Sequence, residues 1–194
     1  PVVYWVLVLV FGPTMYWIPP VHRDKPVTVE NLLIKPEDLP GQWKYDMDPY
    51  FDEDYGNKRL HDDNLIESII NIQDTEGFTQ YVLRYKNKEV AEHRYNVIYK
   101  DMFHIFGSDS ELHKVINVGN IQKLGDRYDV ICNEVIGVQE KTCDIFFKVD
   151  EFVVELNIGI HGADISIRDL EMKVNYYSQL AFSKFVKAGL VEEK

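Results

Sequence analysis

Two cysteines are the residues of this sequence whose types and spacing are most specific for one chemical bond. Cys132 and Cys143 are the only cysteines of the chain, and each lies in an apolar stretch rich in β-formers. If the two stretches pair as antiparallel strands with the cysteines opposite each other, their Cβ atoms come within bonding range of a disulfide. Such a bond indicates an oxidising compartment. The alternative is two free cysteines that pack as small apolar side chains.

The histidines and acids show no spacing typical of a metal or catalytic site. His93 and His104 lie on one expected helix, about 16 Å apart at 1.5 Å per residue, which is too far for one ion. Asp109 and Glu111 beside His113 could act as a base with its orienting group, but a polar loop explains them more simply. The sequence has no H-E-x-x-H, C-x-x-C, G-x-S-x-G or Walker pattern. We therefore expect a protein that is not an enzyme and has no cofactor or metal.

The charge of the chain is strongly acidic. Acids outnumber bases 32 to 21, which gives a formal net charge of −11. This balance excludes a nucleic-acid binder, which needs cationic surface to displace counterions from phosphate. The hydrophobic content of 45% is sufficient for a packed core.

An acidic segment, residues 46–54, is the candidate surface for binding a partner. It belongs to an acidic stretch, residues 36–65, that we expect to form an ordered loop pinned by interleaved aromatic side chains such as Trp43. The segment contains five acids: Asp46, Asp48, Asp52, Glu53 and Asp54. A Ca²⁺ loop is one interpretation, but the EF-hand pattern fails because Gly56 occupies the position of the third ligand. The others are a solvated face and a contact of Asp52, Glu53 and Asp54 with a basic partner, which would weaken with salt.

The N-terminal stretch, residues 1–21, has the features of a membrane anchor. It has no charged side chain, and about 20 helical residues span the hydrocarbon layer. Its ends carry aromatic residues typical of the membrane interface: Tyr4, Trp5, Tyr16 and Trp17. We expect one transmembrane helix with the C-terminal part on the extracytoplasmic side. An uncleaved secretory signal and a buried helix are the alternatives.

A proline-rich linker, residues 22–40, follows the predicted anchor. Proline fixes φ and removes a hydrogen-bond donor, so the linker should be extended and semi-rigid. Part of it is apolar enough to lie against the domain or a neighbour, at Val27, Val29, Leu32, Leu33 and Ile34.

Residues 41–194 have the pattern of one α+β domain. The expected strands are residues 66–72, 79–85, 114–123, 127–135, 142–149 and 151–160. One expected helix runs from its cap at Asn87 to Gly107, and another begins after Ser166. Spacings of three and four predict one buried stripe on each helix, with Ala91, Tyr95, Ile98, Met102 and Ile105 on the first and Leu170, Val174, Tyr177, Ala181 and Phe185 on the second.

The register of the C-terminal strands follows from residue pairs. A tight turn at residues 150–151 places apolar residues opposite each other along one face: Val149 with Phe152, Phe147 with Val154, Ile145 with Leu156, and Cys143 with Ile158. A shift of one residue would destroy this match. Pairing Cys143 with Cys132 also places Ile145 opposite Val130 and Phe147 opposite Tyr128. We expect an antiparallel sheet with one helix-covered face, from which Asp144, Lys148, Glu155 and Asn157 point away.

The element order resembles a known class of domains. It is carried by YVLRYKNKEVAEHRYNVIY, GDRYDVIC, CDIFFKVDEFVVELNIG and DISIRDLEMKVNYYSQL, and the resemblance covers about residues 37–190. The sequence is similar to the PsbP-like extracytoplasmic domains, which are α/β/α sandwiches. The resemblance implies a non-catalytic accessory or assembly role beside a membrane complex and supplies no catalytic residues.

Two functions are therefore in competition. The first is a single-span accessory subunit, with the lipid bilayer and other membrane-protein subunits as its partners. The second is a membrane-anchored sensor or ligand-binding domain, which requires an apolar pocket with a few convergent polar groups.

Overall fold

The computed structural model describes residues 27–50, 61–71, 76–138, 140–161 and 165–192. In this part of the chain the elements are η1 (Val29–Leu32), η2 (Pro36–Asp38), β1 (Trp43–Tyr50), β2 (His61–Asn71), β3 (Glu76–Tyr85), α2 (Lys88–Phe106), β4 (His113–Ile116), β5 (Arg127–Val135), β6 (Glu140–Val149), β7 (Phe152–His161) and α3 (Ile167–Lys187). No helix in the described ranges is long and apolar enough to cross a bilayer. The span predicted at residues 1–21 lies outside those ranges.

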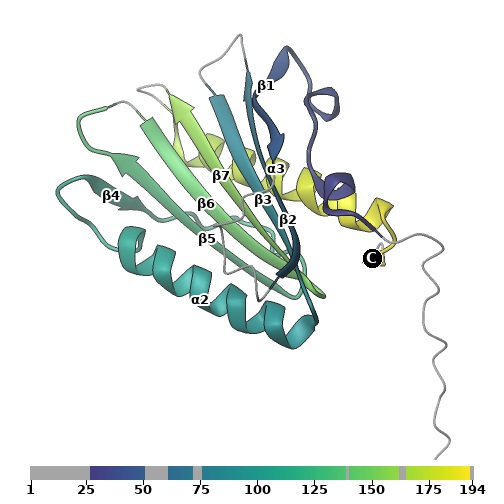
Figure 1. The fold of residues 1–194 in the computed structure, drawn as a ribbon. Helices are drawn as coiled ribbons and strands as arrows, with labels where there is room; N and C mark the ends of the chain where they lie inside the picture. The colour runs from purple at the N-terminus through teal and green to yellow at the C-terminus, as the bar shows by residue number, and fades with distance from the viewer. Residues whose placement is uncertain (1–26, 51–60, 72–75, 139, 162–164, 193–194) are drawn as a thin grey trace, which may run out of the picture.

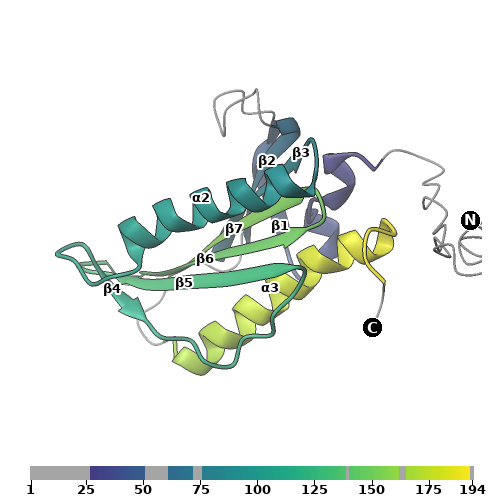
Figure 2. The same cartoon turned by 90° about the horizontal axis from the view of Figure 1, so that it is seen from below.

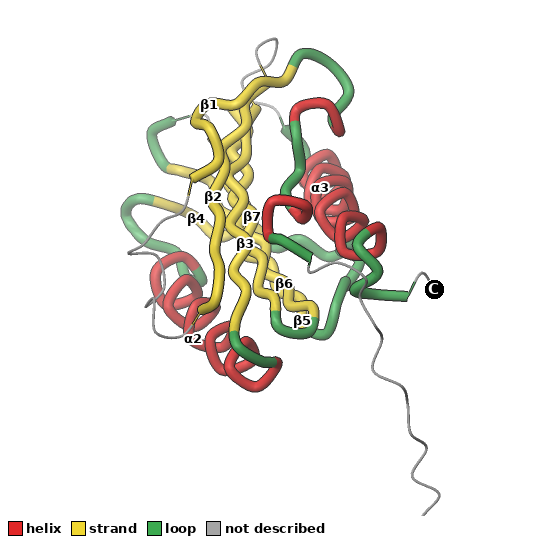
Figure 3. The backbone as a smooth tube through the Cα atoms, turned by 45° about the vertical axis from the view of Figure 1, so that its right-hand side comes forward, coloured by secondary structure: helices red, strands yellow, loops and turns green. Residues whose placement is uncertain are grey.

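The strands form one seven-stranded sheet in the order β1-β2-β3-β7-β6-β5-β4. Every neighbouring pair is antiparallel. Helix α2 connects β3, in the middle of the sheet, to β4 at its edge. Figure 1 shows α2 and α3 beside the strands. Figures 2 and 3 show the two helices on opposite sides of the sheet. The α+β class predicted from the sequence is therefore confirmed.

The predicted strand register is also confirmed. Val149 pairs with Phe152, Phe147 with Val154, Ile145 with Leu156, and Cys143 with Ile158. On the other side of β6, Cys143 pairs with Cys132, Ile145 with Val130, and Phe147 with Tyr128. These side chains belong to the larger of two apolar cores, which α3 covers with the predicted stripe from Leu170 to Phe185.

The register argument placed a helix on one face of the sheet, whereas the α/β/α sandwich implied by the resemblance has helices on both faces, and the structure has the second arrangement. A second core lies under α2 and contains Leu83, Tyr85, Ala91, Tyr95, Ile131, Phe146 and Val153. These residues form a second apolar patch, which has to be buried against another element. Consequently Asp144, Lys148 and Glu155 are buried rather than solvated.

Two of the buried polar groups under α2, Lys148 and Asp144, have well-defined partners. Lys148 Nζ lies 2.9 Å from Asp126 Oδ2 and donates to the carbonyl oxygen of Asp150 at 3.1 Å. Asp144 accepts from Asn157 Nδ2 at 2.5 Å, while burial raises the pKa of the Asp144 carboxyl. Lys148 therefore ties the β6–β7 turn to the loop that precedes β5.

Both long helices begin at the predicted caps. The Asn87 side chain accepts from the backbone N–H of Val90, and the Ser166 side chain accepts from that of Asp169. Ile105, however, was expected in the buried stripe of α2 and is exposed. The last step of the stripe is four residues rather than three, because Phe106 takes the inward position and its ring packs 5.5 Å from that of His113.

Two strands differ from the prediction. Residues 43–50 form the edge strand β1, although they were expected in a loop. The strand expected over residues 114–123 ends at Ile116. It ends there because the backbone N–H groups of Gly119 and Asn120 donate to the Glu171 carboxylate at 2.7 and 3.1 Å rather than to a strand.

Part of the predicted linker lies against the domain, as its apolar residues indicated. Residues 29–39 contribute five buried side chains to the larger core: Val29, Leu32, Leu33, Ile34 and Leu39. The buried amide of Gln80 holds this segment, since its Oε1 accepts from Ile34 N at 2.8 Å and its Nε2 donates to Leu32 O at 3.2 Å. The domain therefore begins before Gly41, and we call residues 29–40 the docked segment.

Candidate ligand-binding site

The disulfide predicted from the strand register is present in the structure. Cys132 and Cys143 are joined at a Cα–Cα distance of 4.1 Å, and both lie inside the larger core with 1% and 0% of their surface exposed. At this depth the bond cross-links β5 and β6 and is shielded from solvent. It therefore has a structural position and is no part of a surface site.

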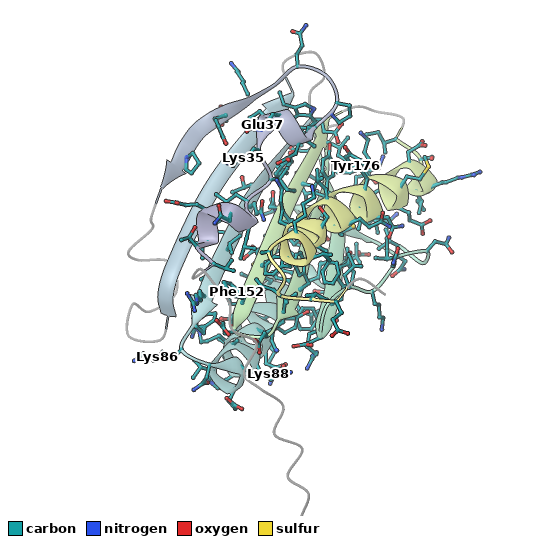
Figure 4. The ribbon with its side chains drawn as sticks, turned by 90° about the vertical axis from the view of Figure 1, so that its right-hand side faces the viewer. Lys35, Glu37, Lys86, Lys88, Phe152 and Tyr176 are labelled. Atoms are coloured by element: carbon teal, nitrogen blue, oxygen red, sulfur yellow. A yellow bond between two sulfur atoms is a disulfide. The ribbon has the colours of Figure 1, made fainter. Side chains whose placement is uncertain are left out.

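A pocket of about 440 Å³ lies where the docked segment, β1, β3 and α3 meet. It is lined by Leu39, Pro40, Trp43, Glu76, Asp169, Met172, Lys173, Tyr176 and Tyr177. Figure 4 labels Tyr176 on α3, and Lys35 and Glu37 on the docked segment. The volume is in the range of small-molecule sites, and apolar walls with a few polar groups are typical of them.

Local structure places each wall of the pocket. Gly41 has a φ of +102°, a conformation that glycine adopts readily, and the resulting turn lets Trp43 Nε1 donate to Pro40 O at 3.0 Å. On α3, the residues at positions 169, 172, 173 and 176 share one side of the helix, because they are three or four residues apart. This side adjoins the buried stripe that fixes α3 on the sheet.

Three aromatic rings form one corner of the pocket. The Trp43 and Tyr177 ring centroids are 6.2 Å apart at an interplanar angle of 74°, and those of Tyr176 and Tyr177 are 5.2 Å apart at 72°. Phe78 supports Tyr177 from the core at 5.3 Å. Tyr177 is buried, whereas Tyr176 has 42% of its surface exposed. The corner therefore combines a rigid base with an accessible ring.

A fixed carboxylate lies beside the rings. Glu76 Oε1 accepts from Tyr177 Oη at 2.5 Å, and Glu76 Oε2 lies 2.5 Å from Lys173 Nζ. Burial, followed by the hydrogen bond and the negative charge of Glu76, raises the pKa of Tyr177. Tyr177 therefore remains a neutral donor at physiological pH. With Asp169, the pocket has two acidic side chains and one basic side chain.

A larger hollow of about 1060 Å³ lies along the C-terminal half of α3. Its lining includes the apolar Leu124, Phe182 and Val186. Its best-placed acid, Asp126, is already bound to Lys148 in the network that ties the β6–β7 turn. This hollow has one aromatic side chain, Phe182, among its lining residues, so we take the aromatic pocket as the candidate site.

The Cys132–Cys143 disulfide is the sequence-predicted site that falls within the described residues, and it does not line this pocket. The predicted interfacial residues Tyr4, Trp5, Tyr16 and Trp17, and the predicted partner-binding residues Asp52, Glu53 and Asp54, lie outside the described residues. The disulfide is in the core beneath α3. Sequence reasoning placed Trp43 in an acidic loop and Tyr177 in a buried stripe, and it did not single out Glu76, Lys173 or Tyr176.

Comparisons with known proteins identify a fold but no family. The chain is similar to the crystal structure of the extracellular domain of PknH from Mycobacterium tuberculosis, with a TM-score of 0.52 and 14% identity over 85% of this chain and 98% of that one. No family model matches the sequence, and no curated protein sequence matches it. The PsbP-like resemblance has no support among these comparisons and stays a prediction. At this identity the likeness to PknH shows a shared fold.

Proposed function

We propose that this chain is the extracytoplasmic ligand-binding domain of a membrane-anchored protein, and that it binds a small molecule without transforming it. The observation that carries the proposal is the aromatic pocket, which Trp43, Tyr176 and Tyr177 line together with the Glu76 carboxylate, itself held by two hydrogen-bond donors. These are the apolar walls and convergent polar groups that the sensor alternative requires. The buried disulfide supports an oxidising, extracytoplasmic location.

The experiment is a thermal-unfolding screen of the full chain in detergent against a varied panel of amines, amino acids, sugars and carboxylates. A ligand that binds the folded state raises the unfolding temperature in a concentration-dependent manner. Tyr176→Ala should remove the shift. Phe103→Ala is the matched control, because Phe103 is an exposed aromatic residue of α2, with 52% of its surface accessible.

The result can contradict the proposal in two ways. If no compound shifts the unfolding temperature, the domain does not bind a ligand of these classes. If a shift persists at full size in Tyr176→Ala, binding takes place away from the aromatic pocket.

A role as an accessory subunit has one observation in its favour. Leu112, Ile136 and Val138 are exposed at the β4 end of the sheet, and Leu112 and Ile136 are adjacent because Ile136 N donates to Leu112 O at 2.8 Å. Exposed apolar patches often contact other proteins. If this patch holds a subunit, replacing Leu112 and Ile136 by serine should release partners from a complex solubilised in mild detergent. A wild-type chain that runs only as a monomer would contradict this role.

A further inference from the structure

We propose that the aromatic pocket recognises an organic cation with an alkylated ammonium group. This inference rests on the proposed ligand-binding function and names the chemical class of the ligand. It follows from the rings, the charges and the hydrogen-bonding state of the carboxylates.

The rings supply attraction for a positive charge. An ammonium group is attracted to the face of an aromatic ring within about 6 Å of its centroid, and most strongly to tryptophan. Tyr176 and Trp43 both stand nearly perpendicular to Tyr177, at 72° and 74°. Both rings therefore pack edge-to-face against Tyr177 and line the same pocket, so a compact cation there lies next to more than one aromatic ring.

The charges of the pocket select against anions. Glu76 and Asp169 are the acids, and Lys173 is the one base among the lining residues. The Lys173 ammonium is already bound to Glu76 Oε2, so it is not available as a separate anion-binding group. The remaining charge is negative, and the formal net charge of −11 adds a field that attracts cations at long range.

The carboxylates favour an alkylated ammonium over a primary amine. Both oxygens of Glu76 already accept hydrogen bonds, from Tyr177 Oη and Lys173 Nζ. Asp169 Oδ2 accepts from Ser166 Oγ at 2.6 Å. At least three of the four carboxylate oxygens of the two acids are therefore already engaged. A primary amine has three N–H groups to satisfy on leaving water, whereas a quaternary ammonium has none.

The other walls suit the alkyl groups. Leu39, Pro40 and Met172 contribute apolar surface, and the thioether of Met172 adapts to irregular shapes. A sugar would depend on several hydrogen-bonding groups, and those of this pocket are largely engaged with one another. The pocket volume of about 440 Å³ accommodates a head group of the size of choline with part of what is attached to it.

The test uses choline and its neutral isostere 3,3-dimethyl-1-butanol, in which carbon replaces the charged nitrogen. Binding to the full chain in detergent is measured by calorimetry and by the shift in unfolding temperature. We expect choline to bind and the neutral isostere to bind at least about tenfold more weakly. Tyr176→Ala should weaken choline binding about fivefold, while Tyr176→Phe, which keeps the ring, and Phe103→Ala should retain it.

Asp169→Asn separates charge from shape. The amide keeps the size and the acceptor for Ser166 Oγ, so α3 keeps its cap. We expect choline binding to fall several-fold at low salt and to differ little from wild type at high salt. Equal binding at all salt concentrations would contradict a role of this carboxylate charge.

The outcomes distinguish a wrong ligand class from a wrong proposed function. If the neutral isostere or a sugar binds as well as choline and Tyr176→Ala weakens both, the ligand class is wrong and the ligand-binding function stands. If neither choline nor any compound of the panel binds, both the class and the proposed function fail.

Discussion

Removing the disulfide should destabilise the domain by an amount that follows from the length of its loop. Cys132 and Cys143 are 11 residues apart. In the chain-entropy model, a cross-link that closes a loop of this length restricts the unfolded chain and stabilises the fold by about 3 kcal/mol at 25 °C. For a domain of this size, each kcal/mol changes the unfolding temperature by roughly 2–4 °C, so the expected fall is about 6–12 °C.

The assay compares oxidised and reduced wild-type protein by urea unfolding followed with circular dichroism. Reduction breaks the bond but keeps both side chains, so the difference in unfolding free energy reports the cross-link alone. A double variant, Cys132→Ala with Cys143→Ala, should be at least as unstable as the reduced wild type, because both positions are fully buried. Its stability should not respond to reductant, which serves as the control.

Two results would refute this reasoning. Free thiols found by alkylation and mass spectrometry of the non-reduced protein would show that the bond is absent and would remove the main chemical argument for an oxidising compartment. Equal unfolding midpoints for oxidised and reduced protein would show that the hairpin is already ordered in the unfolded chain, so that the cross-link restricts nothing further.

Two further perturbations test how the domain is held together. Gln80→Met should lower the unfolding free energy, measured by urea titration, by about 2–4 kcal/mol, because it leaves Ile34 N–H and Leu32 C=O buried without their partner. A loss below about 1 kcal/mol would refute the role of this amide. Burial raises the pKa of Tyr128 to about 12, against the hydrogen bond with Ser178. Because the neutral phenol is favoured in the folded state, Tyr128 contributes roughly 2–3 kcal/mol to the unfolding free energy. This contribution is fully present below pH ~10 and is lost as the pH rises to about 12. Tyr128→Phe should flatten the decline of unfolding free energy over this range, and an unchanged slope would contradict the assignment.

The central strands could be predicted from the sequence because their register is a local property. Side chains alternate with a period of two, so one tight turn after Val149 fixes which residues of β6 and β7 share a face. Pairing Cys132 with Cys143 agreed with the same alternation, because it placed Val130 and Tyr128 opposite Ile145 and Phe147 on one face. The helix caps at Asn87 and Ser166 are local as well, since each cap contacts a backbone group three residues away.

The edge of the sheet could not be predicted in the same way. β1 contains Asp46, Asp48 and Pro49, residues that are depleted in strands and typical of loops. Its pairing with β2 is also irregular, with register shifts on both sides of Met47. Edge strands tolerate such residues because one of their sides has no strand to pair with. The composition of residues 43–50 therefore favoured a loop, whereas pairing with β2 makes this segment an edge strand.

The pocket could not be predicted because its residues meet only in the folded chain. Glu76 is 97 residues from Lys173 and 101 from Tyr177, the two residues that bind its carboxylate. No spacing rule connects positions so far apart. The sequence did contain a local signal on α3, where Met172, Lys173 and Tyr176 form an exposed side next to the buried stripe. That signal shows which side of the helix is accessible, but not what faces it.

The docked segment links the pocket to the part of the chain that precedes the domain. Leu39 and Pro40 line the pocket, and the same segment is held by Gln80 and by the ion pair of Asp38 with Lys184. The pocket is therefore complete only while the segment is docked. By mass action, any ligand that contacts this wall stabilises docking by RT ln(1 + [L]/Kd), about 2.7 kcal/mol at a hundredfold excess over Kd. Because such a ligand would contact Leu39 and Pro40, its binding and the docking of the segment would be thermodynamically coupled, by an energy similar to that expected for the Gln80 amide.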